Sequence, residues 1–244
     1  MVKKITQNNM KEKFSILAIV GSPRENGNTD ILVDRVIQGI ENQQKDVNIE
    51  KVNINNINIK GCQGDNSCRK TGKCIISDDM TILLEKIKKT DALIIGSPIY
   101  RGNLPGQMKI FMDRMHPLEK EVDTQLMKRM RENAAMEILS EITPKAMNNN
   151  MMERKMIMLS QHRYRLEKKL NSIVIVVGAH PKEMPLMKTH LEEIAKDLGW
   201  FSSISGGEIL SRILVGGVSQ KGDILEKKDI LDQAIQAGQN LILN

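Results

Sequence analysis

The sequence predicts an α/β protein with a doubly wound parallel sheet. Two observations support this fold class. Short apolar runs rich in β-branched residues alternate along the chain with amphipathic helical patterns, as in sheets that carry helices on both faces. The chain has 244 residues, of which 40% are hydrophobic and 27% charged, enough to bury one large core. We therefore expect residues 1–244 to form a single domain.

The strands and helices follow in order from these patterns. Four apolar runs are expected to be buried strands: 14–20 (FSILAIV), 47–54 (VNIEKVNI), 91–97 (DALIIGS) and 172–178 (SIVIVVG). A fifth strand is expected within 202–210 (SSISGGEIL). Helical periodicity predicts helices over 29–43, 78–90 and 183–199, and a final helix over 223–242.

One stretch interrupts the alternation between Met115 and Ser172. It is longer than a strand–helix connection needs. Helical patterns lie on both sides of TPKAMNNN (143–150), whose proline and asparagines are typical of a helix stop and a new cap. We expect a helical hairpin, residues 117–170, inserted within the domain. Its methionines are expected to serve as core or as contacts with a second subunit.

Composition excludes several classes of function. The formal charge is +6, but lysine and arginine are interleaved with acidic residues instead of forming a stripe, so no nucleic acid is expected as a partner. No apolar run approaches the roughly 18 residues of a membrane span, so no membrane association is expected. We expect a cytoplasmic protein, in which cysteines stay reduced and a close set of them favours metal or redox chemistry.

The segment GSPRENGNTD (21–30) joins the first strand to the first helix. Such a turn presents backbone N–H groups and a helix N-terminus, which together bind phosphate. Ser22, Asn28 and Thr29 add side-chain donors, and Arg24 adds positive charge. The segment lacks both the lysine of an ATPase loop and the G-x-G-x-x-G pattern of dinucleotide folds. The alternative is a plain turn in which Thr29 caps the helix.

The segment GSPIYRGNLPGQMKIFMDRM (96–115) begins at the carboxyl end of the third strand. In open α/β sheets, ligands bind at this end, near the point where the strand order reverses. The small first half of the segment suits a planar ring. Pro98 holds the turn, Tyr100 supplies a flat face, and Asn103 or nearby N–H groups can bond ring heteroatoms.

Read in order, residues 21–30, 71–80 (TGKCIISDDM) and 91–114 resemble the flavodoxin-like NADPH-dependent FMN reductases, and most of all their iron–sulfur flavoprotein branch. The resemblance covers residues 14–115 and continues more weakly from Ser172; the hairpin has no counterpart in it. It implies a flavodoxin-like five-stranded sheet in the order 2-1-3-4-5. It also implies FMN as cofactor, NAD(P)H as co-substrate and a homodimer or homotetramer.

The resemblance also implies site residues. FMN phosphate contacts are implied for Ser22, Arg24, Asn26, Asn28 and Thr29. Ring contacts are implied for Pro98, Ile99, Tyr100, Arg101, Gly102 and Asn103. The loop 178–185 (GAHPKEMP) would flank the ring from the other side, although this chain has His180 and Pro181 where the family has a glycine-rich run.

The chemistry of such a protein belongs to the flavin, so no catalytic acid–base residues are expected. Tyr100 and Arg101 are the residues expected to tune the ring. The four histidines lie in different segments without metal-ligand spacing, and we expect each to be a surface or packing residue. The G-x-S-x-G elbow of serine hydrolases is absent.

The stretch GCQGDNSCRKTGKC (61–74) holds all three cysteines of the chain. With Asp65 counted, the spacing is C-x2-D-x2-C-x5-C, and the resemblance aligns Cys62, Asp65, Cys68 and Cys74 with the four thiolates of a [4Fe–4S] cluster. A carboxylate is a harder donor than a thiolate and holds cluster iron less tightly. Four outcomes stay open: a [4Fe–4S] cluster with a labile iron on Asp65, a [3Fe–4S] cluster, a loop of free or redox-active thiols, and a zinc site.

Three functions follow from these outcomes. Without a cluster, we expect NAD(P)H to reduce FMN, which then reduces a small-molecule electron acceptor such as a quinone or a flavin. With a cluster, we expect single-electron transfer between a ferredoxin-like protein and FMN. The third alternative is a non-enzymatic flavodoxin-like carrier or interaction module that acts through the hairpin.

Overall fold

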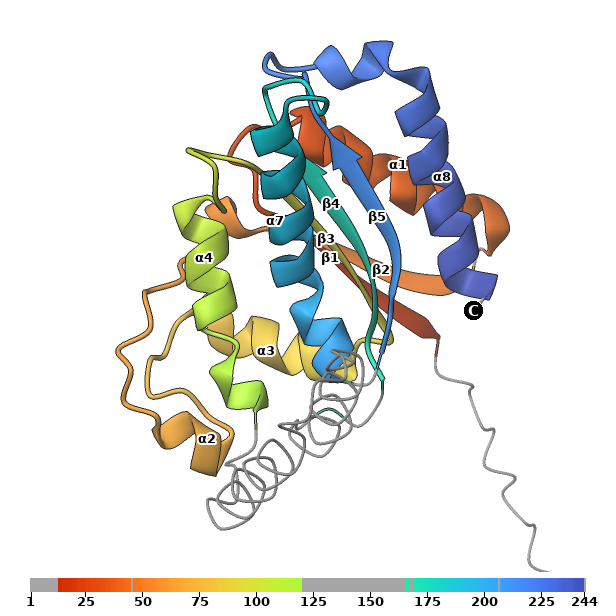
Figure 1. Cartoon of the computed structure of the whole chain (residues 1–244). Helices are drawn as coiled ribbons and strands as arrows, with labels where there is room; N and C mark the ends of the chain where they lie inside the picture. The colour runs from red at the N-terminus through yellow and green to blue at the C-terminus, as the bar shows by residue number, and fades with distance from the viewer. Residues whose placement is uncertain (1–12, 45, 120–165, 167–168, 206, 244) are drawn as a thin grey trace, which may run out of the picture.

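The sheet at the centre of the protein has five parallel strands in the order β2-β1-β3-β4-β5 (Figure 1). The structure, a computed structural model, describes residues 13–44, 46–119, 166, 169–205 and 207–243. The strand order reverses direction between β1 and β3, which are hydrogen-bonded neighbours in the sheet. The predicted flavodoxin-like sheet order is confirmed.

Four of the five strands lie where the apolar runs predict them. They are β1 Phe14–Val20, β2 Val47–Asn53, β3 Ala92–Pro98 and β4 Asn171–Val177. β3 is buried along its whole length, and β4 is buried from its second residue, because helices cover both faces of the central strands. β2 lies at an edge of the sheet and is only partly buried.

The fifth strand is displaced from its predicted position. β5 spans Ile209–Val215, and most of the predicted segment 202–210 lies before it. Helix α7, Pro185–Ile204, continues through the first part of that segment. The prediction was wrong because the serine- and glycine-rich stretch favours the end of a helix before a strand, but α7 continues to Ile204. A Cβ at Gly199 of α7 would lie 2.1 Å from the Ile209 side chain, so the helix passes very close to the start of β5.

The helices form one layer on each face of the sheet (Figure 1). Alternate residues of β1 point to opposite layers: Leu17 and Ile19 pack on one side, and Ile16 and Ala18 on the other. The first layer contains α3 Asp79–Lys89, α4 Gly106–Asp113 and α7. The second contains α1 Asn28–Gln43 and α8 Lys228–Leu243.

Short helical segments complete the described part of the chain. The predicted final helix is divided: a 3-10 helix, η3 Asp223–Glu226, precedes α8. The remaining segments are η1 Ile54–Asn56, α2 Ser67–Thr71 and η2 His116–Leu118. Across the described residues, every helix is too short or too polar to cross a bilayer.

The predicted hairpin, residues 117–170, lies almost wholly outside the described residues. Only residues 117–119, 166, 169 and 170 of this range belong to the described ranges. The hairpin, the single-domain boundary and the homodimer or homotetramer therefore stay predictions.

Candidate functional site

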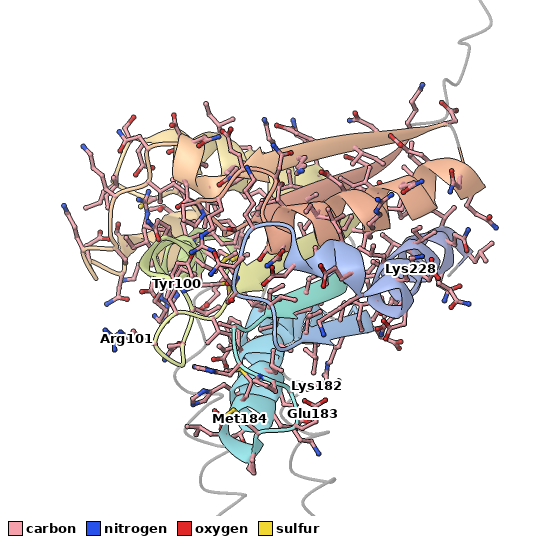
Figure 2. All side chains as sticks on the ribbon, turned by 90° about the horizontal axis from the view of Figure 1, so that it is seen from above. Tyr100, Arg101, Lys182, Glu183, Met184 and Lys228 are labelled. Atoms are coloured by element: carbon pink, nitrogen blue, oxygen red, sulfur yellow. The ribbon has the colours of Figure 1, made fainter. Side chains whose placement is uncertain are left out.

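The loops that follow β1, β3 and β4 meet at the carboxyl edge of the parallel sheet. Figure 2, which looks onto the molecule from above, shows the loop with Tyr100 and Arg101 on one side. The loop with Lys182 and Met184, just ahead of α7, lies on the other. Because β1 and β3 are neighbours at which the strand order reverses, this edge is where an open α/β sheet binds its ligand.

The phosphate loop, which we define as residues 21–27, leads from β1 into α1. Gly27 is the N-cap of α1, and no side chain accepts a hydrogen bond from the first turn at that position. The first N–H groups of the helix, at Asn28 and Thr29, precede the first intrahelical bond, in which Ile31 N donates to Gly27 O. The alternative in which Thr29 caps the helix is wrong, because Thr29 lies inside the first turn and is buried. These uncapped N–H groups suit an anion.

Two predicted phosphate ligands also hold the loop that precedes η3. Arg24 Nη1 donates to Ser219 O at 2.9 Å. Asn28 Nδ2 donates to Gln220 O at 2.8 Å, while Asn28 Oδ1 accepts N–H groups from Gly222 and Ile224 at 3.0 and 3.2 Å. The Asn28 side chain is therefore already bound within the protein, and the backbone N–H of Asn28 is the group that can bind a ligand.

The remaining predicted phosphate residues shape the loop. Ser22 is buried, and its Oγ accepts the Arg24 N–H at 3.2 Å. Asn26 has a φ of 52°, the left-handed region that asparagine tolerates better than most residues. Asn53, at the end of β2, donates from Nδ2 to Ser22 O at 3.0 Å. Asn53 is one of the supporting residues that sequence reasoning missed.

The ring loop, residues 98–103, forms a tight turn after β3. Tyr100 and Asn103 exchange two backbone hydrogen bonds of 2.9 and 3.1 Å, and the residues between them, Arg101 and Gly102, have φ values of 53° and 76°. Positive φ at both central positions is typical of a type I′ turn, which favours glycine. Asn103 Oδ1 accepts the Leu104 N–H at 2.7 Å, so its carbonyl oxygen is already used locally. Pro98 is buried at the end of β3.

A cavity of about 430 Å³ lies beside the ring loop. Its lining comes from the ring loop and from the β4–α7 region: Ile99, Tyr100, Arg101, Gly102, Ala179, His180 and Met187. The two walls that the sequence predicts for a flavin ring are thus brought together around one cavity. Ala179 and His180 belong to the loop 178–185 that was expected to flank the ring, whereas Met187 was not predicted as a site residue. Methionine at a helix start carries no sequence signal that separates a cavity wall from ordinary core.

Gly102 is expected to be sensitive to the addition of a single methyl group. A Cβ there would lie 2.8 Å from His190 Cε1, and φ is in the left-handed region. Gly102→Ala should therefore lower the free energy of unfolding by about 1–2 kcal/mol and weaken flavin binding at the cavity. Gly64→Ala is a matched control, since Gly64 has a φ of 69° but no atom within 4 Å. Urea unfolding and flavin titration check both variants; equal flavin affinity in the two would contradict this role for Gly102.

The cysteine loop, residues 60–78, encloses a smaller cavity of about 60 Å³. All four side chains that the sequence singles out line this cavity: Cys62, Asp65, Cys68 and Cys74. Burial first, and then charge interactions with Cys74, Asp65 and Cys62, raise the pKa of the Cys68 thiol. The four groups are therefore close enough to influence one another. Arg114 and His116 also line the cavity, and sequence reasoning did not assign them to it.

Arg114 closes the base of the cysteine loop. Its guanidinium donates to the Asp78 carboxylate at 2.7 and 2.9 Å, and both side chains are only 1% exposed. It also donates to Lys60 O and Ile76 O, at the two ends of the loop. Burial acts to lower the pKa of Arg114, but Asp78 and Cys74 together raise it above its usual value, so the group is a permanent cation. Within the described residues, Arg114 Nε makes no hydrogen bond.

The donor set does not fit a four-thiolate cluster. Asp65 stands in place of one thiolate, and its Oδ2 accepts the Ser67 N–H at 3.3 Å. No three His, Cys, Asp or Glu side chains in the described ranges are arranged as ligands of one metal ion. All three cysteines are free thiols, with Cys62 exposed and Cys68 buried. The loop brings the predicted ligands to one cavity but does not place them in ligating geometry.

Asp78 should make stability depend on pH under acidic conditions. Burial acts to raise the pKa of Asp78, but the Arg114 hydrogen bond, the Lys60 N–H and the Arg114 charge lower it below its ordinary value of 3.8. A lowered pKa means that the carboxylate contributes stability above the unfolded-state value, and that this stability is lost as pH falls through the folded-state value. The free energy of unfolding should therefore fall below about pH 4. Urea unfolding at stepped pH should show a weaker fall for Asp78→Asn; an identical fall would contradict the assignment.

Comparison with known sequences identifies relatives. A profile of the family described as NADPH-dependent FMN reductase matches residues 14–160. An iron–sulfur flavoprotein of Methanocaldococcus jannaschii is 38% identical over 105 residues, which is 43% of this chain and 53% of the relative. An iron–sulfur flavoprotein of Archaeoglobus fulgidus is 40% identical over 101 residues, 41% of this chain and 45% of the relative. The chain thus spans about half the length of the curated relatives it matches.

Solved structures show the same fold. The NAD(P)H:quinone oxidoreductase of Methanothermobacter marburgensis superposes with a TM-score of 0.62 at 15% identity, covering 94% of this chain and 100% of that one. An azoreductase of Bacillus anthracis gives a TM-score of 0.56 at 12% identity, covering 93% and 99%. At such identities the likeness concerns the fold alone. The profile match over residues 14–160 shows that this chain belongs to the NADPH-dependent FMN reductase family, and its matched region is similar to iron–sulfur flavoproteins.

Proposed function

We propose that the chain binds FMN at the carboxyl edge of its sheet and acts as an NAD(P)H-dependent oxidoreductase. The electrons would pass to a small acceptor such as a quinone or a free flavin. One observation carries this proposal: the uncapped N-terminus of α1 and the cavity of about 430 Å³ follow the neighbouring strands β1 and β3. A phosphate site beside a cavity with an aromatic and apolar lining suits a flavin mononucleotide.

The residues present fit FMN. The N–H groups of Asn28 and Thr29 would receive the phosphate, with Ser22 and Arg24 beside them. Ile99 from the ring loop and Met187 from α7 would provide apolar surface against the ring. FMN, when bound, supplies the redox chemistry, because its ring accepts a hydride.

Tyr100 and Arg101 would act at the open side of the cavity, since Tyr100 is 39% exposed and Arg101 is exposed as well. A cation at this place attracts a phosphate-bearing co-substrate and favours negative charge on the ring. Both groups belong to the turn closed by the Tyr100–Asn103 hydrogen bonds, so the turn determines where they stand.

An absorbance spectrum tests this function. Purified protein should carry absorbance bands at about 375 and 450 nm, typical of bound oxidised flavin. Addition of NADPH or NADH without oxygen should bleach them, and a quinone should restore them. A flavin spectrum that neither nucleotide bleaches would favour the non-enzymatic carrier. Colourless protein that also fails to take up added FMN would contradict both.

Electron transfer through an iron–sulfur cluster is the second candidate, with a ferredoxin-like protein as partner. It is favoured by a specific observation: Cys62, Asp65, Cys68 and Cys74 line one cavity. Against it stands the donor set, which lacks one thiolate. Iron and sulfide should therefore be substoichiometric in the natural protein and rise in Asp65→Cys, which completes the thiolate set. Iron near zero in both, after anaerobic purification, would exclude the cluster.

A further inference from the structure

A buried carboxylate lies next to the site proposed for the phosphate. Asp30, in the first turn of α1, is only 8% exposed. Its Oδ2 accepts the backbone N–H of Asn26 at 2.7 Å, and its Oδ1 pairs with Lys51 Nζ at 2.6 Å. Nothing in the sequence distinguishes this residue, because an acidic side chain in the first helical turn is common and favourable by itself.

Here the carboxylate lies in the same helical turn as the N–H groups that are expected to bind an anion. A phosphate monoester is close to a dianion at neutral pH, and a bare carboxylate in the same helical turn would repel it. Lys51, on β2, compensates for this charge. It contacts Asp30 and also the more exposed Asp34. Partial burial acts to lower the pKa of Lys51, but hydrogen bonds and charge interactions with both aspartates raise it, so the lysine stays protonated.

The hydrogen bond to Asn26 determines the path of the phosphate loop. Among residues 21–27, Asn26 is the residue with positive φ, and its turn leads directly into the N-cap, Gly27. The loop is tight at that point: Gly27 N donates to Arg24 O, and a Cβ on Gly27 would lie 2.8 Å from that oxygen. A left-handed asparagine costs free energy unless its surroundings hold it. The Asp30 carboxylate provides that hold from one turn of helix away.

From these contacts we infer that Asp30 is a positioning residue for the cofactor phosphate: it holds Asn26 in its left-handed conformation, while Lys51 neutralises it. This inference rests on the proposed FMN site and deepens it. The arrangement gives the loop a fixed shape, while Lys51 offsets the negative charge of Asp30 close to the anion. Asp30 itself does not touch the phosphate; it acts through the backbone of residues 26–28.

The test compares FMN with riboflavin, which lacks the phosphate, by quenching of flavin fluorescence. Asp30→Ala removes the acceptor for the Asn26 N–H, and its FMN dissociation constant should rise about tenfold, the usual effect of losing one hydrogen bond to a charged group. Asp30→Asn keeps an oxygen acceptor and should recover most of the affinity. Riboflavin affinity should be the same in wild type and both variants, because the ring cavity is untouched.

Asp34→Asn is the matched control. It removes the other carboxylate that contacts Lys51, but no hydrogen bond connects Asp34 with the phosphate loop in the described structure. This variant should bind FMN like wild type. Lys51→Met leaves Asp30 without its cation, so it should weaken FMN binding several-fold and leave riboflavin binding unchanged. If Asp30→Ala does not fold, Lys51→Met is the variant that tests the inference.

Each result has a defined consequence. Unchanged FMN affinity in Asp30→Ala, or an equal loss of riboflavin affinity, would overturn the positioning role, as would failure of Asp30→Asn to recover affinity. Wild-type protein that binds riboflavin but gains nothing from the phosphate would overturn the phosphate site itself. Wild-type protein that binds neither flavin would overturn the proposed function and this inference with it.

Discussion

Replacing Arg114 with methionine is expected to lower the free energy of unfolding by about 3–5 kcal/mol, the usual effect of removing one partner of a buried ion pair. The variant would leave the Asp78 carboxylate, 1% exposed, without its cation. It would also free two backbone carbonyls, of Lys60 and Ile76, that the guanidinium now binds at the ends of the cysteine loop. Urea unfolding at neutral pH measures the loss.

The same change should loosen the cysteine loop in molecules that stay folded. Cys68 is 7% exposed, and its burial depends on a loop whose two ends are joined through Arg114 and Asp78. Labelling with a thiol reagent should therefore be faster at Cys68 in Arg114→Met than in wild type, while exposed Cys62 should react at the same rate in both.

Two variants separate the buried pair from charge effects in general. Lys109→Met breaks the exposed pair with Asp113 on the same helix, α4, and should cost less than about 1 kcal/mol. The double variant Arg114→Met/Asp78→Asn leaves no unpaired buried charge and should recover part of the loss. A loss as small in Arg114→Met as in Lys109→Met would show that the pair does not hold the loop.

Adding one methyl group at Gly238 is expected to lower the free energy of unfolding by about 2–3 kcal/mol, as overpacking does when backbone cannot yield. A Cβ there would lie 2.0 Å from Val36 O, and a Cβ at Gly39 would lie 1.9 Å from Ile235 O. The two glycines let α1 and α8 approach at backbone contact. Gly238→Ala must push the helices apart, because backbone atoms cannot rotate away as a side chain can.

The consequence should reach the phosphate loop, because α1 begins at Asn28. Gly238→Ala is therefore expected to bind FMN more weakly than wild type as well as to melt earlier. Gly106→Ala is the control: Gly106 begins α4, and a Cβ there would meet no atom within 4 Å. That variant should unfold like wild type or be slightly more stable, since alanine favours helix. Equal stability of the two alanine variants would contradict close packing of α1 on α8.

Much of the architecture followed from the order of apolar runs and helical patterns. β1 and β4 could be located because they are buried on both faces and read as continuous apolar runs, which polar segments bound on each side. β5 was misplaced because α7 continues to Ile204, over residues that were expected to be strand, so the strand begins only at Ile209. The division of the final helix at Lys227 likewise had no sequence signal.

The sites divide in the same way. Local sequence determined the turn at residues 21–27, the type I′ turn with Arg101 and Gly102, and the clustering of the cysteines, because each depends on residues that are neighbours in the chain. Tertiary structure alone decided which distant groups support them. Lys51 reaches Asp30 from β2, and Arg114, the C-cap residue of α4, reaches the cysteine loop. The physical reason is that a buried charge is stable only beside a group of opposite charge. The folded sheet, not the chain order, determines which residue supplies that group.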